Sequence, residues 1–164
     1  MSLDDFLLKY NAKLGDTFAL AKVMDSFPLN TKKYKEQLQT KISFAIQNQN
    51  GEQLELLLAL AWRDGLDLSY KPILKQVILS TWHSCHEDIV EYVGELKDDS
   101  FTEDLFEIAK TEFPYRQYDD ENEATLRKCI HAFKAINSPA SLEKIKLLLA
   151  TGNANVSYAL ELYN

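Results

Sequence analysis

The 164-residue chain contains little glycine, proline and cysteine, and each scarcity excludes a class of protein. With five glycines and neither a GxSxG turn nor a glycine-rich phosphate loop, the sequence offers no nucleotide-binding or serine-hydrolase motif. The two scattered cysteines, Cys85 and Cys129, are too few for a disulfide framework and indicate reduced thiols. Apolar runs such as 56–62 are far shorter than the ~20 residues that cross a bilayer. The Met1–Asp5 start also lacks the basic and apolar parts of a secretion signal, so we expect a cytoplasmic protein without membrane association.

Positive charge is scarce in one stretch of the chain. Residues 85–123 contain fourteen Asp and Glu but only Lys97, Lys110 and Arg116, so this stretch is eleven charges negative in a chain whose total is −7. A concentrated negative field attracts basic proteins and repels nucleic acid. The basic residues elsewhere form short groups such as 32–35, too small for a phosphate-binding stripe. We therefore predict a basic protein partner and no nucleic acid.

Apolar residues recur with helical spacing from end to end, and the helix-breaking residues fall between the periodic segments. No alternating strand pattern competes with this reading, so the sequence predicts an all-α protein of about nine or ten helices. Asn30 or Thr31, Ser69, and His83 or Ser84 are predicted to cap helices. The predicted apolar faces lie within residues 3–14, 20–27, 38–46, 54–61, 73–78, 89–96, 101–109, 126–133, 142–149 and 156–163.

Helix ends recur at spacings of thirty to forty residues. Arg63, Leu96 and Ile136 each close a predicted helix before a short turn. This period is typical of an α-solenoid, in which every helical hairpin covers its apolar faces by stacking on its neighbours. The alternative is an irregular helical bundle whose spacing is accidental.

The C-terminal half resembles the HEAT-repeat family. The residues that carry the resemblance are Ala124, Leu126, Cys129-Ile130, Phe133, Ile136, Asn137-Ser138-Pro139-Ala140, Leu142, Ile145, Leu148-Leu149, Asn153, Val156 and Ala159-Leu160, with a preceding unit from His83 to Ala109. Tyr118-Asp119-Asp120 followed by Cys129-Ile130 resembles a combination seen in small bacterial HEAT-repeat proteins. The resemblance implies a single right-handed α-solenoid of antiparallel helix pairs over residues 1–164, with an irregular helical cap at 1–50 and paired-helix repeats at 51–164. Most members of the family are binding scaffolds, and some small acidic ones resemble immunity proteins, which neutralise a toxin.

The segment from Trp82 to Asp88 contains the densest group of reactive side chains. On a helix, His83 would lie on one face with His86 and Glu87 and could share a metal with them, given a further ligand from Cys129 or His131. No CxxC or HExxH spacing supports such a site, so we expect no metal or other cofactor. A Cys85–His86 nucleophile is excluded because adjacent helical residues point about 100° apart. We interpret the segment as the capped start of a helix and expect no enzymatic activity.

Acidic and aromatic residues of the negative stretch are the candidates for partner binding. Glu87, Glu91 and Glu95 recur every four residues, with only Lys97 nearby on the same helix to relieve their repulsion. The run 119–123 adds four negative charges; its alternative interpretation is a solvated face. Aromatic side chains beside fixed charge are typical of binding hot spots. The candidates are Trp82, His86, Glu87, Glu91, Glu95, Tyr115, Tyr118, Asp119, Asp120 and Glu123.

These residues lead to two hypotheses of function. The first is an immunity protein, a monomer or weak dimer that neutralises a basic bacterial toxin such as a nuclease, as in contact-dependent inhibition. The second is a general HEAT-repeat scaffold or regulatory adaptor. The first requires that the acidic residues share a solvent-facing surface on which the protein's own lysines and arginines do not already neutralise them.

Overall fold

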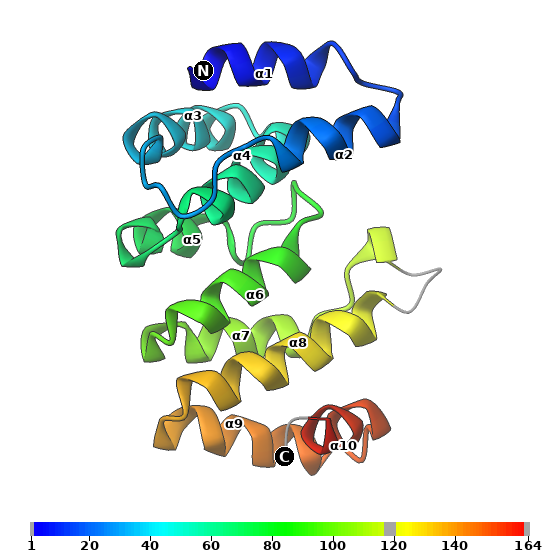
Figure 1. Ribbon diagram of the computed structural model, residues 1–164. Helices are drawn as coiled ribbons and strands as arrows, with labels where there is room; N and C mark the ends of the chain where they lie inside the picture. The colour runs from blue at the N-terminus through cyan, green and yellow to red at the C-terminus, as the bar shows by residue number, and fades with distance from the viewer. Residues whose placement is uncertain (1, 117–120, 163–164) are drawn as a thin grey trace. The chain divides into compact units, whose positions relative to one another are not determined.

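The computed structural model describes residues 2–116 and 121–162, with no side-chain description for residues 116, 121 and 122. These residues form ten α-helices and three short 3-10 helices, and none of them lies in a strand (Figure 1). The predicted all-α class is therefore confirmed. Within the described ranges, every helix is too short or too polar to cross a membrane. The α-helices are α1 Leu3–Asn11, α2 Thr17–Asp25, α3 Lys35–Gln47, α4 Gly51–Asp64, α5 Lys71–Val77, α6 His86–Leu96, α7 Thr102–Lys110, α8 Glu121–Ile136, α9 Pro139–Leu149 and α10 Ala154–Glu161.

The chain divides into two compact units, Met1–Ser69 and Tyr70–Asn164. We predicted one domain whose organisation changes at Gly51. The boundary between the units follows Ser69, and α4 packs against α3 inside the first unit. The change to paired-helix repeats at Gly51 stays a prediction. Each unit is described by itself below.

The first unit is organised by a buried carboxylate at the end of α4. Asp64 accepts hydrogen bonds from Thr31 Oγ1 (2.6 Å) and from the backbone amides of Lys33 (3.1 Å) and Tyr34 (2.9 Å). Asn30 also donates its backbone amide to the Arg63 carbonyl at 2.7 Å. Our prediction that Asn30 or Thr31 caps α3 is wrong, because these groups bond to the end of α4 and the helix begins only at Lys35.

The second unit is built around α8, which packs against α6, α7, α9 and α10. Its buried face carries Cys129, Ile130 and Phe133, all fully covered. α6 approaches α8 most tightly at Gly94. A Cβ atom there would lie 3.2 Å from both Cα and Cβ of Ala132, so only glycine fits this crossing without displacement of the neighbour.

Three helices end in the same way. The C-terminal residues of α4, α6 and α8 are each followed by a residue with positive φ: Gly65 (97°), Lys97 (53°) and Asn137 (54°). Left-handed residues at this position are a common way to end a helix, although lysine adopts the conformation much less readily than glycine. The predicted closing residues Leu96 and Ile136 are confirmed, and Arg63 lies one residue before the observed end.

A hydrogen-bonded clamp joins α3 to the turn after α4. In this turn, Asp67 accepts bonds from the amide and hydroxyl of Ser69. Lys35 on α3 donates to Asp67 at 3.0 Å, and Gln39, one turn later, donates to the Ser69 carbonyl at 3.2 Å. Ser69 thus stabilises the turn and does not cap α5, whose N-cap residue is Tyr70.

The second unit repeats this clamp with different residues. Asp98 accepts the amide of Ser100 at 2.9 Å in the turn after α6. Lys71 on α5 donates to Asp98 at 2.8 Å, and Lys75, one turn later, donates to the Ser100 carbonyl. An Asp-x-Ser turn held by two side chains one helical turn apart therefore occurs in both units.

Candidate functional site

The two histidines of the Trp82–Asp88 segment are buried anchors. His83 Nε2 lies 2.8 Å from the Val77 carbonyl, and His86 Nε2 lies 2.8 Å from the Ser80 carbonyl. A carbonyl oxygen only accepts, so both Nε2 atoms carry the proton. In a neutral ring Nδ1 is then an acceptor. Burial lowers the pKa of His83 and so favours its neutral form.

His86 is the centre of a stack of rings. Its ring lies 4.0 Å from that of Phe113, centroid to centroid, and the Tyr115 hydroxyl donates to its Nδ1 at 2.5 Å. With no exposed surface, His86 cannot belong to a docking face, contrary to our prediction, although it supports Tyr115, which is 40% exposed. The predicted capping by His83 or Ser84 is also wrong, because α6 begins at His86 after Cys85.

The described residues do not assemble a metal site around His83 and His86. Among the described residues, no group of three or more His, Cys, Asp and Glu side chains could hold a metal ion. Both histidines bond through Nε2 to carbonyl groups. Cys129 is fully buried, and this burial strongly raises the pKa of its thiol.

Glu87, Glu91 and Glu95 form an acidic ladder along α6, and a neighbouring helix neutralises the first two. Lys128 on α8 lies 3.1 Å from Glu87 Oε1 and 2.6 Å from Glu91 Oε2. Burial of Lys128 opposes its charge, but the hydrogen bonds that its ammonium group donates to Glu91 and Glu87 outweigh this effect and raise its pKa. From the sequence alone, Lys97 on the same helix is the only cation expected to relieve this repulsion. That inference is wrong because the cation comes from α8.

Further carboxylates of the negative stretch pair with lysines from outside it. Lys144 on α9 lies 2.8 Å from Glu103, and Lys75 on α5 lies 2.5 Å from Asp104. Lys71 pairs with Asp98, and the bonds from Lys71 and Ser100 lower the pKa of Asp98 to about 2. Acidic residues between 85 and 116 therefore join α6, α7 and their turn to the lysine-bearing helices α5, α8 and α9. These ion pairs neutralise many of the carboxylates that the sequence suggested were available to a partner.

The remaining candidates lie in different environments. Trp82 is half-buried with its ring edge against His83, and Glu123 accepts a long bond from Asn153 at 3.4 Å. Glu95 is exposed, and no described lysine or arginine pairs with it. Tyr118, Asp119 and Asp120 lie outside the described residues.

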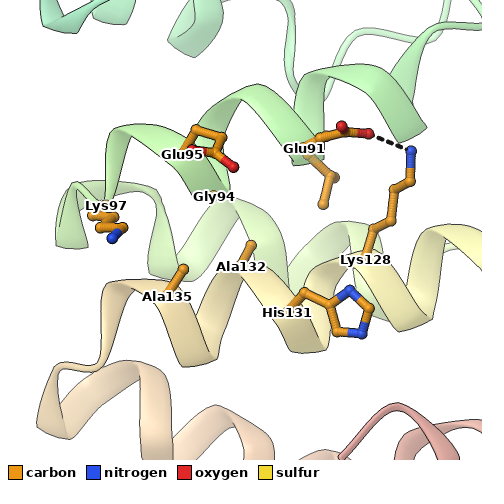
Figure 2. A pocket seen from close by; sticks show the side chains of 9 residues that line it. Glu91, Gly94, Glu95, Lys97, Lys128, His131, Ala132 and Ala135 are labelled. Atoms are coloured by element: carbon orange, nitrogen blue, oxygen red, sulfur yellow. Dashed lines mark hydrogen bonds and ion pairs between the residues drawn. The ribbon is translucent and has the colours of Figure 1, made fainter. Parts of the chain in front are cut away.

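Glu95 lies at a groove of about 470 Å³ between α6 and α8. Figure 2 shows the two helices running in the same direction, with Ala132 and Ala135 below Glu95 and with Lys128 turned toward Glu91. The volume is within the range of pockets that bind small molecules, roughly 300–1,000 Å³. The lining residues are Val90, Glu91, Gly94, Glu95, Lys97, Lys128, His131, Ala132 and Ala135.

Sequence reasoning missed the α8 side of this groove. Lys128 and His131 are three residues apart, so their position on one helical face was predictable. Their position opposite Glu91 depends on how α6 packs against α8, and no local sequence pattern specifies that register. Burial is the main cause that lowers the pKa of His131, and the positive charges of Lys134, Arg127 and Lys128 add to it. Comparison of the chain with protein families, curated proteins and solved structures found no match.

Proposed function

We propose that this protein is a non-catalytic helical-repeat protein that binds a basic protein partner at the α6–α8 groove. The observation that carries the proposal is Glu95, an exposed carboxylate at a groove, in a helix whose Glu87 and Glu91 are already matched by Lys128. The second unit holds sixteen acidic and ten basic residues, so it carries six of the seven net negative charges. Such a field attracts cationic proteins over a range set by ionic strength.

We further propose that the paired helices form a right-handed, HEAT-like α-solenoid. Three features support this arrangement: the left-handed residues after α4, α6 and α8, the clamp that recurs in both units, and the parallel course of α6 and α8. In a solenoid, equivalent helices of successive repeats run in the same direction. Gly94 and Ala132, which meet at the crossing, lie 38 residues apart, a separation comparable to the length of one such repeat.

An immunity protein that neutralises a basic toxin is the specific form of this function that we propose first. A general scaffold or regulatory adaptor is the second candidate, and the internal ion pairs favour it, because they leave fewer carboxylates for electrostatic capture. The two differ in what partner binding does. An immunity protein abolishes the activity of its partner, whereas a scaffold leaves that activity intact.

The test uses the proteins encoded beside this one, since an immunity gene normally adjoins the gene of its toxin. Each neighbouring basic protein is co-expressed with the full chain, purified, and measured for stoichiometry, affinity at several salt concentrations and toxicity to cells. A one-to-one complex that weakens with salt and protects the cells supports the immunity function. A stable complex without protection supports the scaffold, and failure of every basic candidate to bind contradicts the proposed partner class.

A further inference from the structure

The α6–α8 groove has two halves that differ in how their carboxylates are matched. In the first half, Lys128 spans Glu87 and Glu91. In the second half, Glu95 lies opposite Ala132 and Ala135 of α8 (Figure 2). These short side chains carry no charge that could pair with the carboxylate. The small residues keep this half open, and Gly94 allows the helices to approach closely at its floor.

We propose that this second half receives an arginine side chain of the basic partner, with its guanidinium group on Glu95. This inference rests on the proposed function and specifies the contact through which the partner would bind. The aliphatic stem would lie along Ala132 and Ala135, since the methylene groups of arginine pack readily on apolar surface. The guanidinium would then neutralise Glu95 in the same way as the ammonium group of Lys128 neutralises Glu91.

Arginine fits this half of the groove better than lysine does. The guanidinium group is weakly hydrated and forms two parallel hydrogen bonds with a carboxylate, whereas an ammonium group is compact and strongly hydrated. Arginine is also enriched at protein interfaces, and lysine is depleted there. Lys97 lines the same groove and carries charge of the same sign as the incoming group, so it should weaken binding.

The experiment uses the full chain and two defined probes, acetyl-tetra-arginine amide and acetyl-tetra-lysine amide, followed by two-dimensional NMR of the backbone amides. We expect the arginine probe to shift the amides of Gly94, Glu95, Ala132 and Ala135, and to bind more tightly than the lysine probe. E95Q should weaken the arginine probe about fivefold, and K97Q should strengthen it about twofold. A135K, which would give Glu95 an internal cation and fill the groove, should abolish these shifts.

Two controls keep the outcome specific. Glu112 is exposed and does not line the groove, so E112Q should leave the affinity unchanged. Circular dichroism shows whether A135K is folded. E95Q also tests whether probe binding depends on the Glu95 charge, without the added bulk of a lysine. Equal weakening by E95Q and E112Q, equal affinity for the two probes, or shifts spread over the acidic surface would overturn the inference. If a partner found as described above binds E95Q and A135K as tightly as the parent protein, the arginine site is wrong and the groove is not where that partner binds, while binding of a basic partner itself stands.

Discussion

Replacing Lys128 with glutamine tests whether the acidic residues are matched inside the protein. The ammonium group pairs with Glu87 and Glu91, and the three side chains are 29%, 28% and 49% exposed. Partly exposed pairs contribute about 0.2–1 kcal/mol each. Once Lys128 is neutral, the like charges of Glu87 and Glu91, one helical turn apart, add about 0.3 kcal/mol of repulsion. The K128Q variant should therefore lose about 1–1.5 kcal/mol of unfolding free energy at pH 7.

Urea denaturation at low ionic strength measures this difference. The matched control is K146Q, because Lys146 is 74% exposed and its ion pair among the described residues lies within its own helix, with Glu143 at 3.6 Å. Its effect should stay below about 0.5 kcal/mol. In 1 M salt, where the screening length is about 3 Å, the loss in K128Q should shrink. The folded-state pKa of Lys128 is raised, so its contribution is fully present below the unfolded value of about 10.4 and is lost as pH rises through the folded value.

The triple variant K128Q/E87Q/E91Q separates charge matching from packing. If the loss in K128Q comes from uncompensated carboxylates, removal of both charges should restore part of the lost stability. A K128Q protein as stable as the parent, or a triple variant less stable than K128Q, would refute internal matching. The acidic ladder would then again require a partner for its explanation.

Three further predictions follow from other parts of the chain. Asp64→Ala should lower the unfolding free energy by about 3 kcal/mol, since it leaves three donors, one of them the buried amide of Tyr34, without their acceptor. Hydrogen exchange at the amides before α3 should accelerate, and a loss below about 1 kcal/mol would contradict this role. Asp98→Asn should cost about 1 kcal/mol at pH 7, after allowance for solvent screening. Because the folded pKa of Asp98 is depressed to about 2, this difference should disappear as pH falls from about 4 through 2 in acid-unfolding curves. Cys85 and Cys129 should resist iodoacetamide at pH 8 in the native state and react in urea, as mass spectrometry would show; rapid native labelling would contradict their burial.

The helices were predictable because their apolar residues recur with the helical period and local residues mark their ends. Ser138-Pro139 shows this directly: the sequence predicts a helix start there, and the structure has Ser138 as N-cap and Pro139 at the first helical position. His83 shows the limit. Its side chain could cap the helix that follows or bond to a carbonyl of the preceding segment, and only the folded position of Val77 decides between them.

The candidate site was less predictable than the fold, because charge matching depends on which helix lies beside which. The excess of acid over base in residues 85–123 is visible in the sequence, and so is the spacing of Glu87, Glu91 and Glu95. The cation that neutralises two of these glutamates comes from Lys128, 37 residues after Glu91. No local pattern specifies that distance, since it reflects the length of the intervening helix and loops.

In the second unit, helices that carry carboxylates pack against helices that carry lysines, so the order of the helices cannot be changed without loss of these ion pairs. α7 directs Asp104 to a lysine of α5 and Glu103 to a lysine of α9, and α6 depends in the same way on α8. A hairpin duplicated or exchanged within this array would set carboxylates against carboxylates at its new borders. Recombination or design that lengthens the protein must therefore transfer each acidic hairpin together with its basic neighbours.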